Sequence, residues 1–440
     1  MEPLSERATS SGGDRRIPAP DPITRDYLLL ALRVGKALPG VVDAYFGPAE
    51  LKAQVDDEAP FAAARLREDA STLEARILRE VDDPDRQRWL QAQLVAFEAQ
   101  AQTLAGDPLP YSDYIACLFD LAPERTDESV FESAAEELTR LVPSGELRSE
   151  TMADRLTAWD AQFRIHPDRL PALVDWLMGH LRERADRLLG LPDGEQVEFV
   201  YVSGGPWGAY NQYEGGCRTL IEVNTDLVCS PADLIAMVAH ECYPGRHTEH
   251  AWKERSLVQE LGRLEASVDL LNTPQALITE GLAYLGERMV VPEGAMPEFL
   301  VELYKRASLA VAADPARARD AADRQVRIVR AKAALRGVTA NAAFMLHAEG
   351  VGREDVASYL RRYLLLSPEK AEKRLALIED PICRAEVVVG SEGERLLHRW
   401  FQLGLGDDQV DRFGRLLREQ LTPGLLSSEV AATGYEQDGL

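Results

Sequence analysis

Helical periodicity of apolar residues is the feature that most limits what this chain can fold into. Between Thr24 and Leu38 the apolar residues fall on one broad stripe, and Leu90, Leu94 and Phe97 recur at positions i, i+4 and i+7. Similar stretches run through 61–80, 127–141, 149–163 and 169–189, and prolines at 84, 110, 123, 143 and 167 separate them. The sequence therefore predicts a mainly α, multi-helix protein.

A small β element is predicted near the middle of the chain. Residues 197–202 (VEFVYV) and 217–224 (CRTLIEVN) have the β-branched and aromatic composition of strands, and a Gly-rich aromatic loop at 204–211 lies between them. Helical periodicity resumes at residue 231. We therefore expect a disordered tail over 1–20, a helical cap domain over 21–190, and a second helical domain over 191–440 that contains a short β-hairpin.

The composition limits the classes of partner. With 49 Lys+Arg against 73 Asp+Glu the net charge is −24, so the surface repels nucleic-acid phosphates and anionic membranes. No apolar run approaches the roughly 20 residues that span a bilayer, and residues 1–20 lack the apolar core of a signal peptide. The five cysteines are scattered and show no CxxC pattern. We expect a cytoplasmic protein that binds neither nucleic acid nor membrane.

The segment HECYPGRH at 240–247 carries the strongest chemical signal. Ser230, Pro231 and Asp233 predict the start of a well-capped helix, which brings His240 and Glu241 about three turns in. A His-Glu pair on a helix, followed by another histidine, is typical of zinc hydrolases, in which the histidines bind the metal and the glutamate acts on water. Three of the 7 histidines, at 240, 247 and 250, lie within eleven residues.

The spacing of the two histidines leaves two alternatives. His240 and His247 are seven residues apart, which on a straight helix means about 10.5 Å along the axis, too far to share one zinc ion. Pro244 must open the helix, because it cannot donate a hydrogen bond to the His240 carbonyl. If three residues loop out, His247 reaches the second ligand position. If two loop out, Arg246 takes that position, and an arginine does not bind zinc.

A carboxylate on a later helix is the expected third ligand. Glu280 has the apolar neighbours Leu277, Ile278 and Leu282, and a buried carboxylate needs a partner such as a metal ion. Gly281, the next residue, allows a close approach of another backbone.

The sequence thus predicts one Zn²⁺ ion per chain, bound by His240, His247 and Glu280. The metal would lower the pKa of its bound water, and Glu241 would accept the proton as general base. Residues 191–440 are accordingly the predicted catalytic, metal-binding domain, and the expected substrate is a peptide or a small-molecule amide.

Weaker candidates surround this constellation. Tyr284 and Tyr210 are the first choices for a catalytic oxyanion donor, with His347 a further candidate, and four more side chains are candidates for substrate binding: Asn211, Tyr213, Arg218 and Arg246. Tyrosines, His347 and Arg218 in such settings are more often packing or surface residues. His250 is expected to be solvated or to support a ligand, and Cys242 to be a small core residue.

Two further patterns have a functional and a structural interpretation. The predicted strand 217–224 could pair with an extended peptide, or it could be an ordinary internal strand. Six arginines between 317 and 336 include a possible clamp for a substrate carboxylate, but a helix face paired with Asp314, Asp320 and Asp323 is the more common arrangement.

Five segments together resemble a known family: HECYPGRHTEH at 240–250, PWGAYNQYEGG at 206–216, IEVNTDL at 221–227, NTPQALITEG at 272–281 and GVVDAYFGPAEL at 40–51. They are similar to the bacterial family called domain of unknown function 885, from about residue 25 to about 403. The resemblance implies a helical, gluzincin-like metallopeptidase fold with zinc. It assigns His240, Glu241 and Glu280 to the first metal ligand, the catalytic glutamate and the later metal ligand. The family usually has histidine where this chain has Arg246.

Two rival functions follow from that arginine. One is a repurposed metal enzyme that acts on a small amide in a biosynthetic pathway. The other is a metal-free pseudo-peptidase that uses the fold as a binding module, which an arginine in the ligand position would favour.

Overall fold

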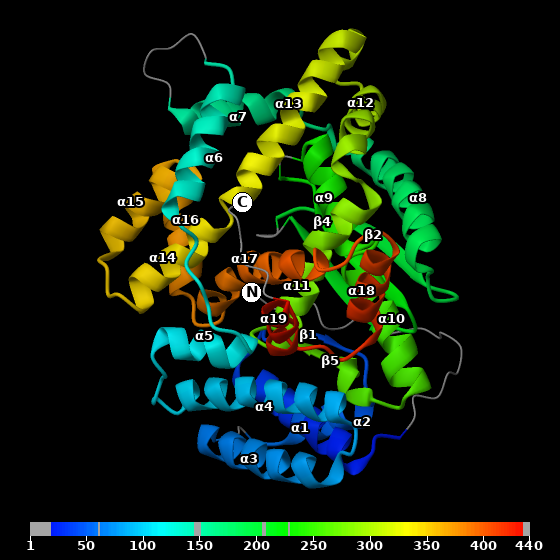
Figure 1. Cartoon of the computed structure of the whole chain (residues 1–440), viewed down its shortest axis with the longest axis vertical. Coiled ribbons are helices and arrows are strands. Elements are labelled where there is room, and N and C mark those ends of the chain that lie inside the picture. The colour runs from blue at the N-terminus through cyan, green and yellow to red at the C-terminus, as the bar shows by residue number, and fades with distance from the viewer. Residues whose placement is uncertain (1–18, 60–61, 145–150, 205–207, 228, 434–440) are drawn as a thin grey trace.

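The computed structural model describes residues 19–59, 62–144, 151–204, 208–227 and 229–433. Helices make up most of these residues (Figure 1), which confirms the mainly α architecture. The first eight α-helices are α1 (Pro22–Ala37), α2 (Ala49–Asp57), α3 (Ala63–Glu80), α4 (Pro84–Leu104), α5 (Tyr111–Phe119), α6 (Glu128–Leu141), α7 (Met152–Gln162) and α8 (Leu170–Leu189). Six of these, α1, α3, α4 and α6 to α8, match the helical stretches predicted from periodicity. Most of the predicted N-terminal tail lies outside the described residues.

The remaining α-helices follow the small sheet. They are α9 (Pro231–Glu241), α10 (Arg246–Lys253), α11 (Pro274–Val290), α12 (Met296–Arg306), α13 (Pro315–Ala334), α14 (Gly337–His347), α15 (Arg353–Leu364), α16 (Pro368–Glu379), α17 (Cys383–Phe401), α18 (Asp407–Arg418) and α19 (Pro423–Ala432). No helix in the described part of the chain is both long and apolar enough to cross a membrane.

Capping residues fix where the key helices begin. The Ser230 hydroxyl accepts a hydrogen bond from the Asp233 backbone N–H, and the Asp233 carboxylate accepts one from the Ser230 N–H. This is the predicted capping box, and Pro231 occupies the first turn of α9 as expected. Thr273 caps α11 in a similar way, with Pro274 in its first turn. These local signals set the register of the two helices that carry His240 and Glu280.

Two hydrophobic cores hold the helices together. The smaller core joins α1 to α4 with the segment 258–270, and includes Tyr27 and Phe97. The larger core runs from Ala96 to Leu426 and joins α5 to α8 with the sheet and the later helices. It draws on residues from both sides of position 190, because α8 packs against α9, so the packing places no division between cores at the predicted domain boundary. In Figure 1 the blue N-terminal helices lie together at one end.

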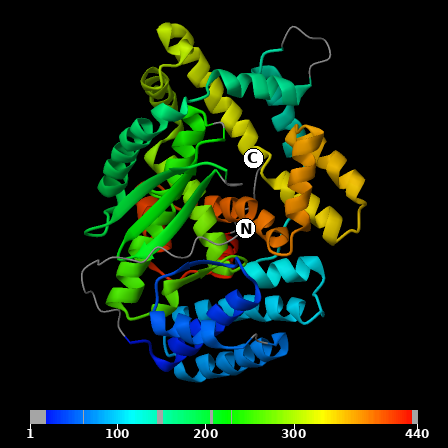
Figure 2. The ribbon, with the colours of Figure 1, turned by 180° about the vertical axis from the view of Figure 1, so that it is seen from behind.

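The predicted β element is a three-stranded sheet. Its strands β2 (Gln196–Val202), β3 (Ala209–Gly215) and β4 (Arg218–Asn224) are ordered β2-β4-β3, with β2 parallel and β3 antiparallel to β4. In Figure 2 the three strands lie on the side of the molecule that faces the viewer. The two predicted strands are confirmed, and β3 begins within the predicted loop. Because β4 is central and paired on both edges, residues 218–224 form an internal strand, and the expectation that this strand pairs with a peptide is wrong.

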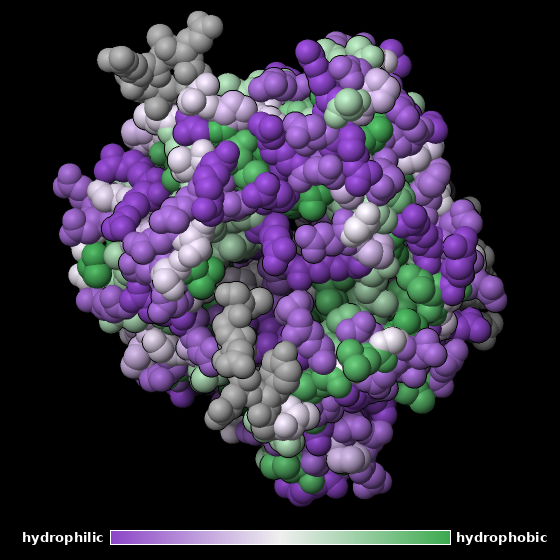
Figure 3. Space-filling model, turned by 45° about the horizontal axis from the view of Figure 1, so that its top comes forward, coloured by the Kyte–Doolittle hydropathy of each residue, from purple (hydrophilic) through white to green (hydrophobic). Residues whose placement is uncertain are grey.

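A second small sheet and one tight helix pair complete the surroundings of the site. Strand β1 (Val42–Tyr45) pairs antiparallel with β5 (Val268–Leu270), which joins the N-terminal part to the segment before α11. Helices α11 and α17 touch through Gly281 and Gly393: a Cβ atom on Gly281 would lie 2.5 Å from the Gly393 carbonyl oxygen. The predicted close approach at Gly281 is therefore confirmed. Hydrophilic residues cover most of the face seen in Figure 3, as the net charge of −24 leads one to expect.

Candidate functional site

Helix α9 ends at the predicted break, directly after the His-Glu pair. Cys242 leaves the helical conformation (φ −118°, ψ −86°), the Tyr243–Pro244 peptide bond is cis, and α10 begins at Arg246. The Gly245 N–H donates to the Ala239 carbonyl, 3.0 Å away. A Cβ atom on Gly245 would lie only 1.9 Å from the His240 carbonyl oxygen, so this reversal requires glycine. The break thus places α10 directly after the last turn of α9. Cys242 is fully buried in the larger core, as predicted.

His240 and Glu280 meet between α9 and α11. The His240 Nε2 atom lies 3.4 Å from Glu280 Oε2, and both side chains are largely buried. Burial alone would raise the pKa of Glu280, but His240, Arg246 and the Tyr284 hydroxyl outweigh it and lower the pKa to about 2. Burial in turn lowers the pKa of His240, but Glu280 and Glu241 raise it above its ordinary value. The pair is therefore a carboxylate and an imidazole that favours its charged form.

Arg246 lies where the sequence analysis placed its second alternative. Its guanidinium pairs with Asp43 of β1, and Nη1 lies 3.7 Å from Glu280 Oε2. Burial lowers the pKa of Arg246, but Asp43, Glu241 and Glu280 raise it well above its ordinary value, so the group is charged. Its Nε atom is buried and has no hydrogen-bond partner among the described residues. A fixed positive charge therefore lies beside the His240–Glu280 pair.

His247 points to the sheet instead of toward Glu280. Its ring is fully buried, with Nε2 2.9 Å from Glu195 Oε2 and Nδ1 2.8 Å from the Thr219 hydroxyl. Glu195 also accepts hydrogen bonds from the Tyr243 hydroxyl and from Arg182, so this carboxylate is satisfied. Successive residues on a helix point about 100° apart, so once Arg246 faces Glu280, His247 cannot. Both ring nitrogens of His247 are held by groups other than the His240–Glu280 pair.

The donor set does not fit a zinc ion held by His240, His247 and Glu280. Only two of the three side chains come together, and the third position holds a guanidinium, which has donors and no lone pair for a metal. Within the ranges that the structure describes, no three His, Cys, Asp or Glu side chains are grouped so that they could hold a metal ion. The second alternative, in which Arg246 takes the ligand position, is the arrangement found.

Three acidic residues that the sequence analysis did not select complete the site. Asp43, Asp269 and Glu386 line one hollow together with Arg246 and Glu280, and its other lining residues are Leu270, Leu271, Ala276 and Thr279. Burial, helped by Glu280 and Asp43, raises the pKa of Glu386 to about 8, and its Oε2 atom has no partner in the described chain. Burial likewise raises the pKa of Asp43. Of the three, only Asp43 lies in a segment named in the sequence analysis, GVVDAYFGPAEL.

Among the other catalytic candidates, only Tyr284 lies at the pair. Its ring stands edge-on to the His240 ring, with the centroids 5.2 Å apart, and its hydroxyl helps to lower the pKa of Glu280. Tyr210 is 41% exposed, and burial of its hydroxyl raises its pKa. His347 is half-buried, with Nε2 2.8 Å from the Ile378 carbonyl oxygen and its ring against Tyr111, so it is a packing residue away from the pair.

The other substrate-binding candidates, Asn211, Tyr213 and Arg218, do not join Arg246 at the pair. The Asn211 side-chain amide donates to the Glu241 carbonyl oxygen, 2.8 Å away, and so supports the end of α9. Tyr213 is buried, its hydroxyl donates to Glu254, and its ring stacks on His250. Arg218 opens β4 opposite Gln196 and does not line the hollow that contains Arg246.

Two other sequence expectations have clear outcomes. His250 is buried instead of solvated, and its Nε2 atom lies 3.2 Å from Asp269 Oδ2. The arginines of α13 form the predicted salt-bridged face, including Arg319 with Asp323 and Arg324 with Asp320.

Comparisons with known proteins leave the family open. No protein-family model matches the chain, and no curated protein matches it. A solved structure from Colwellia psychrerythraea, described as a "putative lipoprotein", is 15% identical with a TM-score of 0.48. That match covers 82% of this chain, and the chain spans 66% of the length of the other. The resemblance to domain of unknown function 885 stays a prediction.

Proposed function

We propose that this protein cleaves an amide bond of a small peptide or amide, with the Arg246 guanidinium in the place that a metal ion would take. The observation that carries this proposal is the buried Arg246 beside the His240–Glu280 pair, next to the end of α9 where Glu241 lies. The reaction class is the one predicted from the sequence, without the zinc ion.

The charges support a division of roles. The negative charge of Glu241 acts on both His240 and Arg246, so its carboxylate lies within electrostatic reach of each. Glu241 accepts the proton of a water molecule whose oxygen attacks the amide carbonyl carbon. The carbonyl oxygen gains negative charge, which the unpartnered Nε–H of Arg246 stabilises. When the C–N bond breaks, the leaving amine takes a proton from imidazolium His240, which Glu280 orients.

Chelator-treated protein tests this proposal. The substrates are amino-acid anilides and dipeptide anilides, whose cleavage releases a coloured amine. We expect turnover to survive removal of metal, to fall at least about 100-fold in Glu241→Gln and Arg246→Gln, and to remain in the exposed control Arg187→Gln on α8. Turnover that disappears with chelator and returns with zinc would refute the role of Arg246 and support the zinc hydrolase predicted from the sequence.

One observation favours the pseudo-peptidase instead. Arg246 already has two carboxylate partners, Asp43 and Glu280, so the charges of the site are balanced without a substrate. Binding of an anilide without turnover, together with loss of binding in Arg246→Gln, would identify a binding module.

A further inference from the structure

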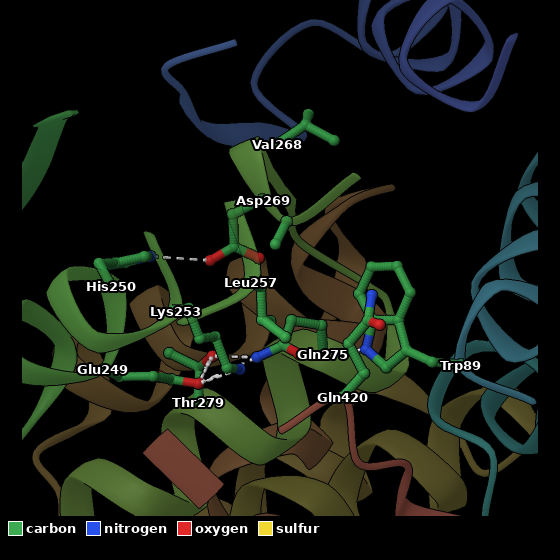
Figure 4. A pocket seen from close by; sticks show the side chains of 11 residues that line it. Trp89, Glu249, His250, Lys253, Leu257, Val268, Asp269, Gln275, Thr279 and Gln420 are labelled. Atoms are coloured by element: carbon green, nitrogen blue, oxygen red, sulfur yellow. Dashed lines mark hydrogen bonds and ion pairs between the residues drawn. The ribbon is translucent and has the colours of Figure 1, made fainter. Parts of the chain in front are cut away.

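A second hollow (Figure 4) shares the lining residues Asp269 and Thr279 with the first. Two of its apolar lining residues, Trp89 and Val268, belong to the smaller core. Trp89 of α4 closes one side, α10 contributes Glu249, His250 and Lys253, and the other lining residues are Leu257, Ala266, Val268, Gln275 and Gln420. Five polar residues line this hollow and not the first, and the proposed reaction uses none of them: Glu249, His250, Lys253, Gln275 and Gln420.

The two carboxylate oxygens of Glu249 differ in their hydrogen bonding. Its side chain is only 1% exposed. Oε1 accepts three hydrogen bonds, from Lys253 Nζ at 2.6 Å, Gln275 Nε2 at 3.0 Å and the Thr279 hydroxyl at 3.1 Å. Oε2 is buried and has no partner within the described chain. A buried carboxylate oxygen without a donor is costly, so its presence points to a donor that the chain does not supply.

The opposite wall offers one more acceptor. His250 Nε2 lies 3.2 Å from Asp269 Oδ2, as the dashed line in Figure 4 marks. Because a carboxylate only accepts, Nε2 carries the hydrogen of this bond. The other oxygen of this carboxylate, Asp269 Oδ1, is buried and unpartnered among the residues described. Two unpartnered carboxylate oxygens therefore belong to residues that line one hollow.

We infer that this hollow is a subsite for a primary ammonium group, such as the free amine of an amino-acid amide or peptide substrate. An ammonium has three N–H donors, and two of them can serve the unpartnered carboxylate oxygens of Glu249 and Asp269. The term substrate rests on the proposed function, because the hollow shares a wall with the one that contains Arg246.

The charges of the lining select a cation. Both carboxylates of the lining, Glu249 and Asp269, have an unpartnered oxygen, and the ammonium of Lys253 donates to the other oxygen of Glu249. An added ammonium can donate to these unpartnered oxygens, whereas an anion would face both carboxylates. Leu257, Val268 and Trp89 provide apolar surface for the carbon atoms next to the amine.

Binding of ethylammonium chloride by the full chain tests the inference without any turnover. Saturation-transfer NMR measures binding, with ethanol as the uncharged analogue of the same size and potassium chloride as the competing cation. Three non-hydrogen atoms limit the dissociation constant to about millimolar. We expect ethylammonium to bind, and Glu249→Gln and Asp269→Asn each to weaken binding about tenfold or more. The control Glu260→Gln removes an exposed carboxylate beside α10 and should change nothing.

Three results would overturn the inference: no binding by the wild type, equal binding of ethanol, or displacement by equimolar potassium. Unchanged binding in folded Glu249→Gln and Asp269→Asn would do the same. If either variant fails to fold, judged by circular dichroism, the wild-type comparison of the three probes still decides. Because this assay needs no cleavage, its failure leaves the amide-cleavage test intact, and the converse holds too.

Discussion

Replacing Glu280 with glutamine should remove a stabilisation that can be calculated from the structure. In the folded chain the pKa of Glu280 is about 2, because His240, Arg246 and Tyr284 outweigh the effect of burial. Its ordinary value is 4.5. That gap corresponds to about 3 kcal/mol of stability at neutral pH, since a carboxylate with a lowered pKa stabilises the folded state above its unfolded pKa. Glu280→Gln keeps the volume and removes the charge, so it should lose about this amount.

The stabilisation by Glu280 should decrease as the pH falls. As the pH falls below about 4.5 the unfolded chain takes up the proton before the folded chain does, so the stabilisation disappears toward pH 2. Urea unfolding should show a wild-type advantage of about 3 kcal/mol over Glu280→Gln at pH 7, and less than half of that at about pH 3.

A matched control lies on the same helix. Burial raises the pKa of Glu287 of α11, so its charged form is disfavoured and Glu287→Gln should not destabilise the protein at pH 7. An advantage below about 1 kcal/mol at Glu280, or one that does not change with pH, would refute the electrostatic reasoning. So would an equal loss in both variants.

Three further substitutions test other parts of the site. Arg246→His adds an imidazole beside His240 and Glu280, so it should raise the zinc content measured by elemental analysis above that of the wild type; equal contents would contradict the assigned role of Arg246. Gly245→Ala should destabilise the protein by more than about 3 kcal/mol or prevent folding, because the added Cβ would lie 1.9 Å from the His240 carbonyl oxygen. Gly208→Ala is the control, because its Cβ would have its nearest neighbour at 3.8 Å and should be tolerated. Urea unfolding measures both variants. Glu386 has a pKa of about 8, above its ordinary value, so the stability of the wild type should fall between about pH 5 and pH 8. The stability of Glu386→Gln should lack this fall. Unfolding curves that change in parallel with pH would show that Glu386 is ionised there.

Local signals were sufficient for much of the fold. Ser230, Pro231 and Asp233 set the start of α9, and the Pro-Gly pair fixed its end, because caps and prolines act on neighbouring residues. The number of residues that loop out could not be read from the sequence. It depends on the contacts of His247 with Glu195 and Thr219, which are distant in the chain.

The acidic partners of Arg246 were missed for the same reason. Asp43 and Glu386 lie far from residue 246 in the sequence, and only the packing of β1 and α17 around α11 brings them near. Neither has a motif of its own. A lone acidic residue in an amphipathic or turn-rich segment resembles the many solvated acids of a chain with net charge −24.

The contact between Gly281 and Gly393 has a consequence for specificity. Because backbone touches backbone there, α11 and α17 lack the layer of flexible side chains that lets other helix pairs slide over each other. Glu280 is next to Gly281, and Glu386 lies two turns before Gly393 on the same rigid pair. The spacing between these two acids is thus set by main-chain geometry, and under the proposed function a substrate that contacts both would have to match it.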